Sequence, residues 1–215
     1  LGAGGHARVL IDAARMLELT VEAVLDVDPG RTGEWFCGLK IQHEEALGKK
    51  YKRGKHFLWN AIGSTDRLDA RSNLYWSWHN KDWVFGSCIH PYAIIAKGVR
   101  IGEGAQVMAG AIIQAGAVIG QNTLINTGAI IEHDCQIGDS THVAPGAIVC
   151  GGCIIEDRVH VGVGAKIIQQ RHIGQACTIA AGAVVINNLY SGTRVAGVPA
   201  RDIHSHHDTN TAAMP

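Results

Sequence analysis

The densest group of side chains capable of acid–base chemistry in this sequence is Glu132-His133-Asp134. A histidine titrates near neutral pH, and a neighbouring carboxylate can hold its ring in one tautomer, so His133 with Asp134 is a candidate general base. Three other histidines directly precede an isoleucine or valine in the same half of the chain: His142, His160 and His172. What each imidazole can do depends on the direction in which the surrounding chain points it.

The chain around these histidines repeats with a period of six residues. From Ile89 to Val185 every sixth residue is isoleucine or valine, and the residue two places earlier is usually Ala, Ser, Thr or Cys. Residues two apart on a strand point to the same side, so both sets are expected to point inward. The pattern predicts a hexapeptide parallel β-helix whose three sides close a coil of about eighteen residues. Residues eighteen apart then stack roughly 4.8 Å apart.

This register predicts where the histidines lie. His133 follows an inward isoleucine by two residues and falls at a corner, and Gly151, eighteen residues later, should lie beside it on the next coil. A histidine next to a bare backbone N–H suits acyl transfer, because the imidazole accepts a proton from the nucleophile while the N–H stabilises the oxyanion. His142, His160 and His172 should point outward, which favours an ordinary surface role for each. His142 and His160 are expected to stack.

The N-terminal part carries a different pattern. Residues 1–6 (LGAGGH) form a glycine-rich turn before a helical pattern, residues 21–26 are a predicted strand ending in Asp26, and residues 56–62 are a second, closed by Gly63. Turn, helix and strand with a terminal acid are typical of a Rossmann-like βαβ unit. The strand that should precede the turn is missing, which suggests a trimmed N-terminus. The turn departs from G-x-G-x-x-G, which favours a mononucleotide or a nucleotide sugar over a dinucleotide.

Composition limits the function classes. Nineteen basic and nineteen acidic side chains give a net charge of zero, which offers no electrostatic case for nucleic acid or an anionic membrane. No apolar run is long enough to span a bilayer. Six cysteines without a disulfide-like framework suit a reducing cytoplasm. Cys150 and Cys153 form a C-x-x-C, but Cys153 occupies a small inward position, so we interpret the motif as a by-product of the repeat.

The aromatic residues indicate a division of the chain. All five tryptophans precede residue 84. We therefore predict a Rossmann-like domain over residues 1–86 and a β-helix domain over residues 87–203. Residues 204–215 are polar and aperiodic, which predicts a disordered tail.

Several motifs together resemble one family. They are GAGGH at residues 2–6, Asp26, Asn60-Ala61-Ile62-Gly63 with Arg67, the run from Asn126 to Asp134, and Gly197-Val198-Pro199-Ala200-Arg201. The chain resembles the hexapeptide-repeat sialic acid O-acetyltransferases and nucleotide-amino-sugar N-acetyltransferases, including the bacillosamine-pathway and perosamine enzymes. The resemblance covers nearly the whole chain, and it implies that the coil is left-handed.

The resemblance also implies roles for individual residues. His133 corresponds to the catalytic base, Asp134 to the acid that polarises it, and Gly151 to the glycine whose N–H meets the thioester carbonyl. The implied nucleotide-sugar pocket consists of Gly4, Gly5, His6, Asp26, Gly63 and Arg67. The implied acetyl-CoA site consists of Asn126, His142, Gly151, Gly197, Val198, Pro199 and Arg201.

The predicted function is acetyl-CoA-dependent N-acetylation of a nucleotide-linked amino sugar, by direct transfer without an acyl-enzyme and without a metal. The resemblance implies a homotrimer with active sites between neighbouring prisms, and the cysteines predict a cytoplasmic location. Three alternatives stay open: O-acetylation of sialic acid or another sugar, a γ-carbonic-anhydrase-like zinc enzyme, and a non-catalytic scaffold that binds a sugar nucleotide.

Overall fold

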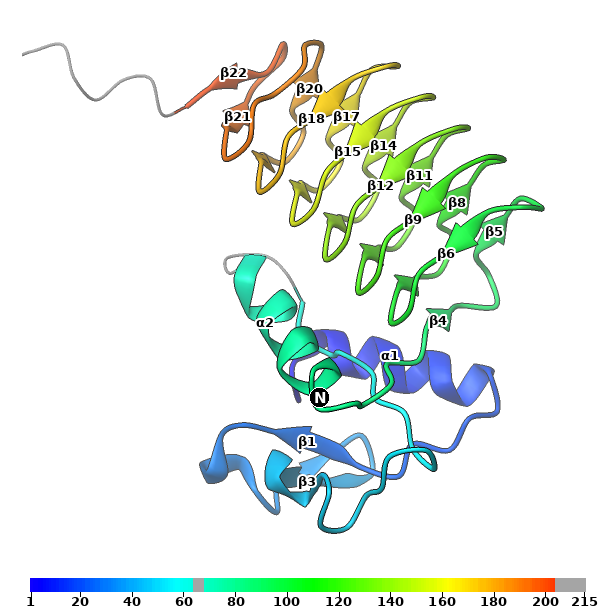
Figure 1. The fold of residues 1–215 in the computed structure, drawn as a ribbon, viewed down its shortest axis with the longest axis vertical. Helices are drawn as coiled ribbons and strands as arrows, with labels where there is room; N and C mark the ends of the chain where they lie inside the picture. Colours follow the sequence, from blue (N-terminus) through cyan, green and yellow to red (C-terminus); the bar gives the residue numbers. More distant parts are fainter. Residues whose placement is uncertain (64–67, 204–215) are drawn as a thin grey trace, which may run out of the picture.

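The computed structural model describes residues 1–63 and 68–203, so Arg67 and the tail predicted over residues 204–215 lie outside the described residues. Within this part, a small N-terminal unit of helices and strands is followed by a long three-sided coil (Figure 1). Neither described helix has the length and apolar character needed to cross a membrane.

The coil consists of three faces, each built from two-residue strands that pair in parallel. Face one contains β4 (Cys88–Ile89), β7 (Gln106–Val107), β10 (Leu124–Ile125), β13 (His142–Val143), β16 (His160–Val161) and β19 (Thr178–Ile179), and is extended by β21 (Arg194–Ala196) and β22 (Arg201–Asp202). Face two contains β5 (Ile94–Ile95), β8 (Ile112–Ile113), β11 (Ile130–Ile131), β14 (Ile148–Val149), β17 (Lys166–Ile167) and β20 (Val184–Val185). Face three contains β6 (Arg100–Ile101), β9 (Val118–Ile119), β12 (Gln136–Ile137), β15 (Ile154–Ile155) and β18 (His172–Ile173).

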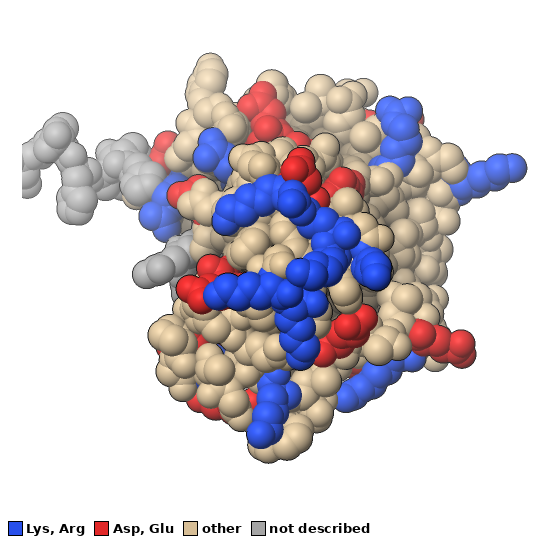
Figure 2. Space-filling view, turned by 60° about the horizontal axis from the view of Figure 1, so that its bottom comes forward, with Lys and Arg blue, Asp and Glu red and all other residues tan. Residues whose placement is uncertain are grey.

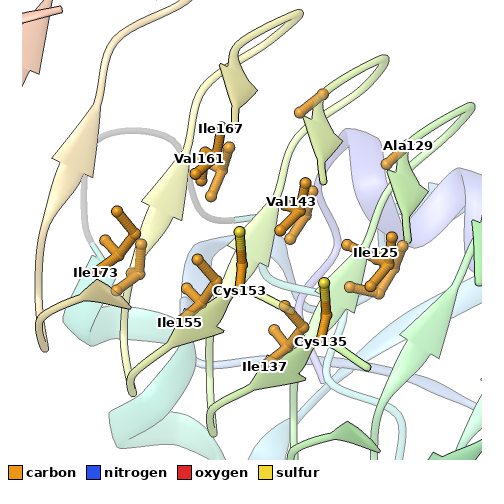
Figure 3. Close-up of a cluster of buried hydrophobic side chains, with 14 of the residues drawn as sticks. Ile125, Ala129, Cys135, Ile137, Val143, Cys153, Ile155, Val161, Ile167 and Ile173 are labelled. Carbon is orange, nitrogen blue, oxygen red and sulfur yellow. The ribbon is translucent and has the colours of Figure 1, made fainter. Parts of the chain in front are cut away.

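The predicted register is confirmed. Between β4 and β20, paired residues on successive coils are eighteen apart, as in Leu124 with His142 and Ile130 with Ile148. The predicted inward aliphatic residues from Val107 to Val185 are at most 3% exposed, and each buried side chain of this size stabilises the fold by about 1.5–3 kcal/mol. Figure 3 shows Cys135 and Cys153 within this core. The first coil is less well covered, with Ile89 39% exposed and Ile95 and Ile101 only partly buried, because no coil lies below it.

The N-terminal unit is a small mixed sheet with two α-helices. Its elements are α1 (Gly5–Met16), β1 (Val24–Asp26), β2 (Trp35–Phe36), β3 (Leu39–His43), α2 (Leu68–His79) and two 3₁₀ turns, Pro29–Arg31 and Glu44–Ala46. β3 lies between β1, which is parallel to it, and β2, which is antiparallel. This content is smaller than a complete doubly wound sheet, so the Rossmann-like domain and its boundary at residue 86 stay predictions.

The chain start and residues 56–62 complete the edge of this unit. The amide of Gly2 donates to Leu25 O at 2.7 Å, and the amide of Ala61 donates to Leu1 O at 2.7 Å, so residues 1–2 run between β1 and residues 59–61. The strand predicted over residues 56–62 is wrong as a regular element. Its one β-bridge joins Leu58 to Phe85, and Trp59 and Ala61 exchange hydrogen bonds with Leu1 on the other side.

The N-terminal unit packs against the outside of face one. Ala7 and Leu10 of α1 share a core with Cys88, Met108 and Leu124, which point outward from the first coils. Next to this core, the buried guanidinium of Arg71 donates to Asn122 O of the coil at 3.0 Å and to Asn60 O and Ile62 O of the N-terminal unit at 3.0 and 2.9 Å. The two parts are therefore held together along one side of the prism.

Charge is uneven over the surface despite the net charge of zero. Figure 2 shows Lys and Arg side chains gathered at the end of the molecule formed by the N-terminal unit. Residues 49–55 contribute five exposed basic side chains, Lys49, Lys50, Lys52, Arg53 and Lys55. Glu45 and Asp82 each lie 3.1 Å from one of them, so this end keeps a basic surplus.

Candidate active site

A cleft of about 700 Å³ lies where the N-terminal unit meets face one. It is lined by all the described residues that were predicted to bind the nucleotide sugar, and also by two residues of the coil that were predicted to bind acetyl-CoA. These are Gly4, Gly5, His6, Asp26 and Gly63 from the N-terminal unit, and Asn126 and His142 from the coil. The structure thus brings together residues that are more than 100 positions apart in the sequence.

The glycine-rich turn leaves open space at the mouth of this cleft. A Cβ atom on Gly4 or Gly5 would meet no protein atom within 4 Å, and neither residue has a positive φ. Packing and backbone conformation therefore do not require glycine here, and the bare backbone leaves room for a ligand at the start of α1. Asp26 holds the turn in place, because its Oδ2 accepts from Ala3 N at 2.9 Å and lies 3.3 Å from Arg31.

The surface role predicted for His142 is wrong. The residue points outward from the prism, but it is only 3% exposed because the N-terminal unit covers this part of face one. Asn126 Oδ1 accepts from Thr127 N at 2.8 Å, so Asn126 Nδ2 is the atom that faces His142 Nε2 at 3.1 Å. The predicted stacking of these residues on successive coils is confirmed, since His142 pairs with His160 and their rings lie 5.0 Å apart, edge to face. His172 is exposed and lies 2.7 Å from Glu156.

His133 and Gly151 are adjacent, as predicted. His133 lies at the corner after β11, and its Nδ1 is 2.8 Å from Asp134 Oδ2. A Cβ atom on Gly151 would stand 2.5 Å from His133 Nε2, so the imidazole lies against the bare backbone of the next coil. The hydrogen bond to Asp134 raises the pKa of His133 above its ordinary value, because the carboxylate favours the protonated ring.

Gly116 is a residue that sequence reasoning missed. It lies one coil below Asp134, and a Cβ atom there would collide with Asp134 Oδ1. The absence of a side chain at Gly116 therefore leaves room for the carboxylate that contacts His133. The available signal was the spacing, since Gly116 precedes Asp134 by eighteen residues, as His133 precedes Gly151.

The His133 corner is separate from the cleft in a single chain. Asn126 lies at the corner between faces one and two, whereas His133 lies at the corner between faces two and three. His133, Asp134 and Gly151 are not among the residues that line the cleft. The outward side of face two separates them, and its first four positions are isoleucines in successive coils: Ile94, Ile112, Ile130 and Ile148.

The remaining predicted acetyl-CoA residues lie at the C-terminal end of the prism. Gly197, Val198 and Pro199 connect β21 to β22, and Arg201 begins β22. The amide of Val184, three coils beyond β11, donates to Gly197 O at 3.0 Å, which places this segment about four coils beyond His133, or roughly 19 Å along the prism. Within the described residues, no group of three or more His, Cys, Asp or Glu side chains is arranged to hold a metal ion.

Comparison with known proteins agrees with this architecture. The family model described as bacterial transferase hexapeptide (six repeats) matches residues 116–151. No curated protein sequence matches the chain. Among solved structures, WeeI from Acinetobacter baumannii is 27% identical, with a TM-score of 0.82 over 94% of this chain and 97% of that one.

Two further structures are more similar in sequence. GDP-perosamine N-acetyltransferase from Caulobacter crescentus, crystallised as a histidine-to-alanine variant with CoA and GDP-perosamine, is 34% identical, with a TM-score of 0.84 over 94% of this chain and 93% of that one. The acetyltransferase domain of PglB from Neisseria gonorrhoeae is 32% identical, with a TM-score of 0.86 over 94% and 97% of the two chains. The chain therefore belongs to the hexapeptide-repeat sugar acetyltransferases, folds as a left-handed parallel β-helix and is an acyltransferase.

Proposed function

We propose that this acyltransferase moves the acetyl group of acetyl-CoA to the amine of a nucleotide-linked amino sugar. The observation that carries the proposal is the contact of His133 with Asp134 on one side and with the bare backbone of Gly151 on the other. The crystals of the Caulobacter crescentus enzyme with CoA and GDP-perosamine, and of the PglB domain with acetyl coenzyme A, support the choice of substrates.

His133 is the proposed general base. Asp134 accepts the hydrogen of Nδ1, so Nε2 carries the free lone pair, and Nε2 is the ring atom nearest to Gly151. The neutral amine attacks the thioester carbonyl, a C–N bond forms, and the C–S bond breaks as the tetrahedral intermediate collapses. Nε2 takes the proton that the nitrogen loses and passes it to the departing sulfur of CoA.

Gly151 is the proposed oxyanion donor. Its N–H makes no hydrogen bond among those found for the described residues, so it is available to the thioester oxygen. Acetyl-CoA then lies along the corner from Gly151 towards Gly197, Val198, Pro199 and Arg201. Neither Cys150 nor Cys153 takes part, because burial raises the pKa of Cys150 and Cys153 is wholly inside the coil.

The proposed nucleotide site is the cleft. The N-terminal unit, taken as a Rossmann-like domain, holds the nucleotide at Gly4 and Gly5, with Gly63 and Asp26 forming the walls. The sugar then points towards Asn126 on the coil. We place the protein in the cytoplasm, where its six unpaired cysteines stay reduced.

The proposed assembly is a homotrimer. The cleft and the His133 corner lie at opposite edges of face two, so a single chain does not bring the sugar to the base. On face two Ile94 is 64% exposed and the outward isoleucines above it are half-buried, and packing this face against a neighbour would bury them further. A threefold arrangement repeats that contact three times and places His133 of one chain beside the cleft of the next.

The direct test is release of free thiol from acetyl-CoA with a panel of 3-amino and 4-amino nucleotide sugars. We expect turnover with at least one of them, and none with the corresponding hydroxy sugars. Release with free sialic acid alone would contradict N-acetylation, and binding without any thiol release would indicate a scaffold.

A mixing experiment tests the shared site. His133→Ala removes the base, and Gly4→Val fills the space that the nucleotide would occupy at the glycine-rich turn. Each variant alone should therefore be inactive. In mixed trimers, roughly a quarter of the interfaces combine an intact cleft with an intact His133, so activity should return. If the mixture stays inactive although chains exchange, or if the protein sediments as a monomer at micromolar concentration, the shared-site proposal is wrong.

A further inference from the structure

His6 connects the cleft to the coil through a single side-chain contact. The residue lies in the first turn of α1 and lines the cleft. Its Nε2 is 2.8 Å from Oε1 of Gln106, a wholly buried residue of β7 that is 100 positions away in the sequence. Gln106 pairs directly with Leu124, which also lines the cleft, so this contact lies on the side of the cleft that faces the coil.

The hydrogen-bond partners of Gln106 determine which way its amide points. Its Nε2 lies 2.8 Å from Asn60 O, which also accepts from Arg71 at 3.0 Å. A backbone carbonyl can only accept hydrogen bonds, so the amide nitrogen must face Asn60 and the amide oxygen must face His6. An amide oxygen also only accepts, and the hydrogen of the contact must therefore be carried by His6 Nε2.

The other ring nitrogen of His6 is consequently the one left for the cleft. Burial lowers the pKa of His6 to about 4, and the nearby cation of Arg71 acts in the same direction, so the ring is neutral at pH 7. A neutral imidazole with its hydrogen on Nε2 has a lone pair on Nδ1. The hydrogen bonds found for His6 among the described residues include none at Nδ1.

We propose that His6 is a specificity-determining hydrogen-bond acceptor for the sugar of the substrate, and that Gln106 is the positioning residue that sets this polarity. The inference rests on the proposed function. It names a property of the ligand: the group that meets Nδ1 must be a donor, such as a sugar hydroxyl or amine. A phosphate oxygen would face the lone pair and be disfavoured, so the diphosphate belongs at Gly4 and Gly5 and not at His6.

The proposal also implies that a change in a residue of the coil alters the cleft of the N-terminal unit. If Gln106 were replaced by a side chain without an acceptor, the Nε2 hydrogen would lose its partner and the other tautomer would become populated. His6 would then present a donor to the cleft in part of the molecules, and a donor from the sugar would meet another donor.

The test uses Gln106→Met, which keeps the length of the side chain and removes both hydrogen bonds, with Gln136→Met on the exposed part of face three as the matched control. Imidazole ¹⁵N spectra of the free protein at pH 7 report the tautomer directly. We expect the wild type and the control to carry hydrogen on Nε2 of His6, and Gln106→Met to show a mixture. We also expect the KM for the nucleotide amino sugar to rise about three- to tenfold in Gln106→Met, the worth of one hydrogen bond, with kcat and the KM for acetyl-CoA little changed.

A second variant guards against a merely structural effect. Gln106→Glu keeps an acceptor for His6 but cannot donate to Asn60, so it should retain hydrogen on Nε2 even if the melting temperature falls. A wild-type ring with hydrogen on Nδ1, a charged ring at pH 7, or an unchanged spectrum and KM in Gln106→Met would overturn the proposal. If no nucleotide amino sugar is acetylated, the proposed function is wrong, and so is the sugar as the ligand of His6. The tautomer of His6 is tested separately, because the spectrum of the free protein reports it without any substrate.

Discussion

A single methyl group added at Gly151 should test whether acyl transfer depends on the exact position of the His133 imidazole. The substitution keeps every proposed catalytic group and changes only where the imidazole lies. Gly151 has no positive φ, so alanine introduces no left-handed strain. Its Cβ would stand 2.5 Å from His133 Nε2 and 2.7 Å from Cε1, whereas ordinary contact begins at 3.4 Å. The ring must therefore move by about 1 Å, and since the side chain of His133 is 65% exposed it can swing outward at little cost in stability.

We expect Gly151→Ala to lower kcat by about 10²-fold, the usual effect of a 1 Å misplacement of a reacting group, while the melting temperature stays the same. The swing also breaks the 2.8 Å contact with Asp134, which keeps the pKa of His133 raised. The ring would then lose its proton at lower pH, so the rising limb of kcat/KM should move to lower pH. Thiol release at saturating acetyl-CoA, measured across pH, checks both expectations.

The control is the same substitution in a His133→Ala background, where the clash no longer exists. There the added methyl group should have little further effect, giving strong non-additivity between the two sites. An equal loss of kcat in both backgrounds would refute the reasoning, because the methyl group would then be acting on the thioester and not on the imidazole.

Three further predictions follow from the same geometry. Asp134→Asn should lower kcat less than the roughly 10²–10⁴-fold expected for His133→Ala, because Asp134 orients the base without accepting its proton. The rising limb of kcat/KM should move to lower pH, since the raised pKa of His133 is lost. A limb that moves to higher pH would contradict this. Gly116→Ala and Gly128→Ala introduce similar backbone strain, with φ of +78° and +65°, but only Gly116→Ala collides with Asp134. Only Gly116→Ala should therefore lose more activity than its change in melting temperature accounts for. Equal losses of activity in the two variants would disprove the role of Gly116. Ile131→Asp places an unpaired carboxylate in a fully buried core position and should destabilise the coil by several kcal/mol, and a wild-type thermal melt would show that the inward register is wrong.

The catalytic corner could be predicted because the coil converts sequence separation into spatial separation. A period of six that continues without insertion determines which side chains point inward, and stacking at eighteen places Gly151 beside His133 without knowledge of any other part of the chain. The same rule could have identified Gly116 beside Asp134, and it correctly placed His142 next to His160. In a parallel coil each side chain is positioned by its own repeat and its two neighbours, so local pattern is sufficient.

Contacts between the two parts of the chain were decided only by the tertiary structure. The buried state of His142, the hydrogen bond of His6 with Gln106 and the guanidinium of Arg71 all depend on how the N-terminal unit docks on face one. Docking depends on the fit of irregular surfaces that follow no period, so the sequence alone does not show which outward residues become covered. The sequence by itself determined the prism and the neighbours of His133, whereas the cleft and the protonation of His6 come from the packing of one unit against the other.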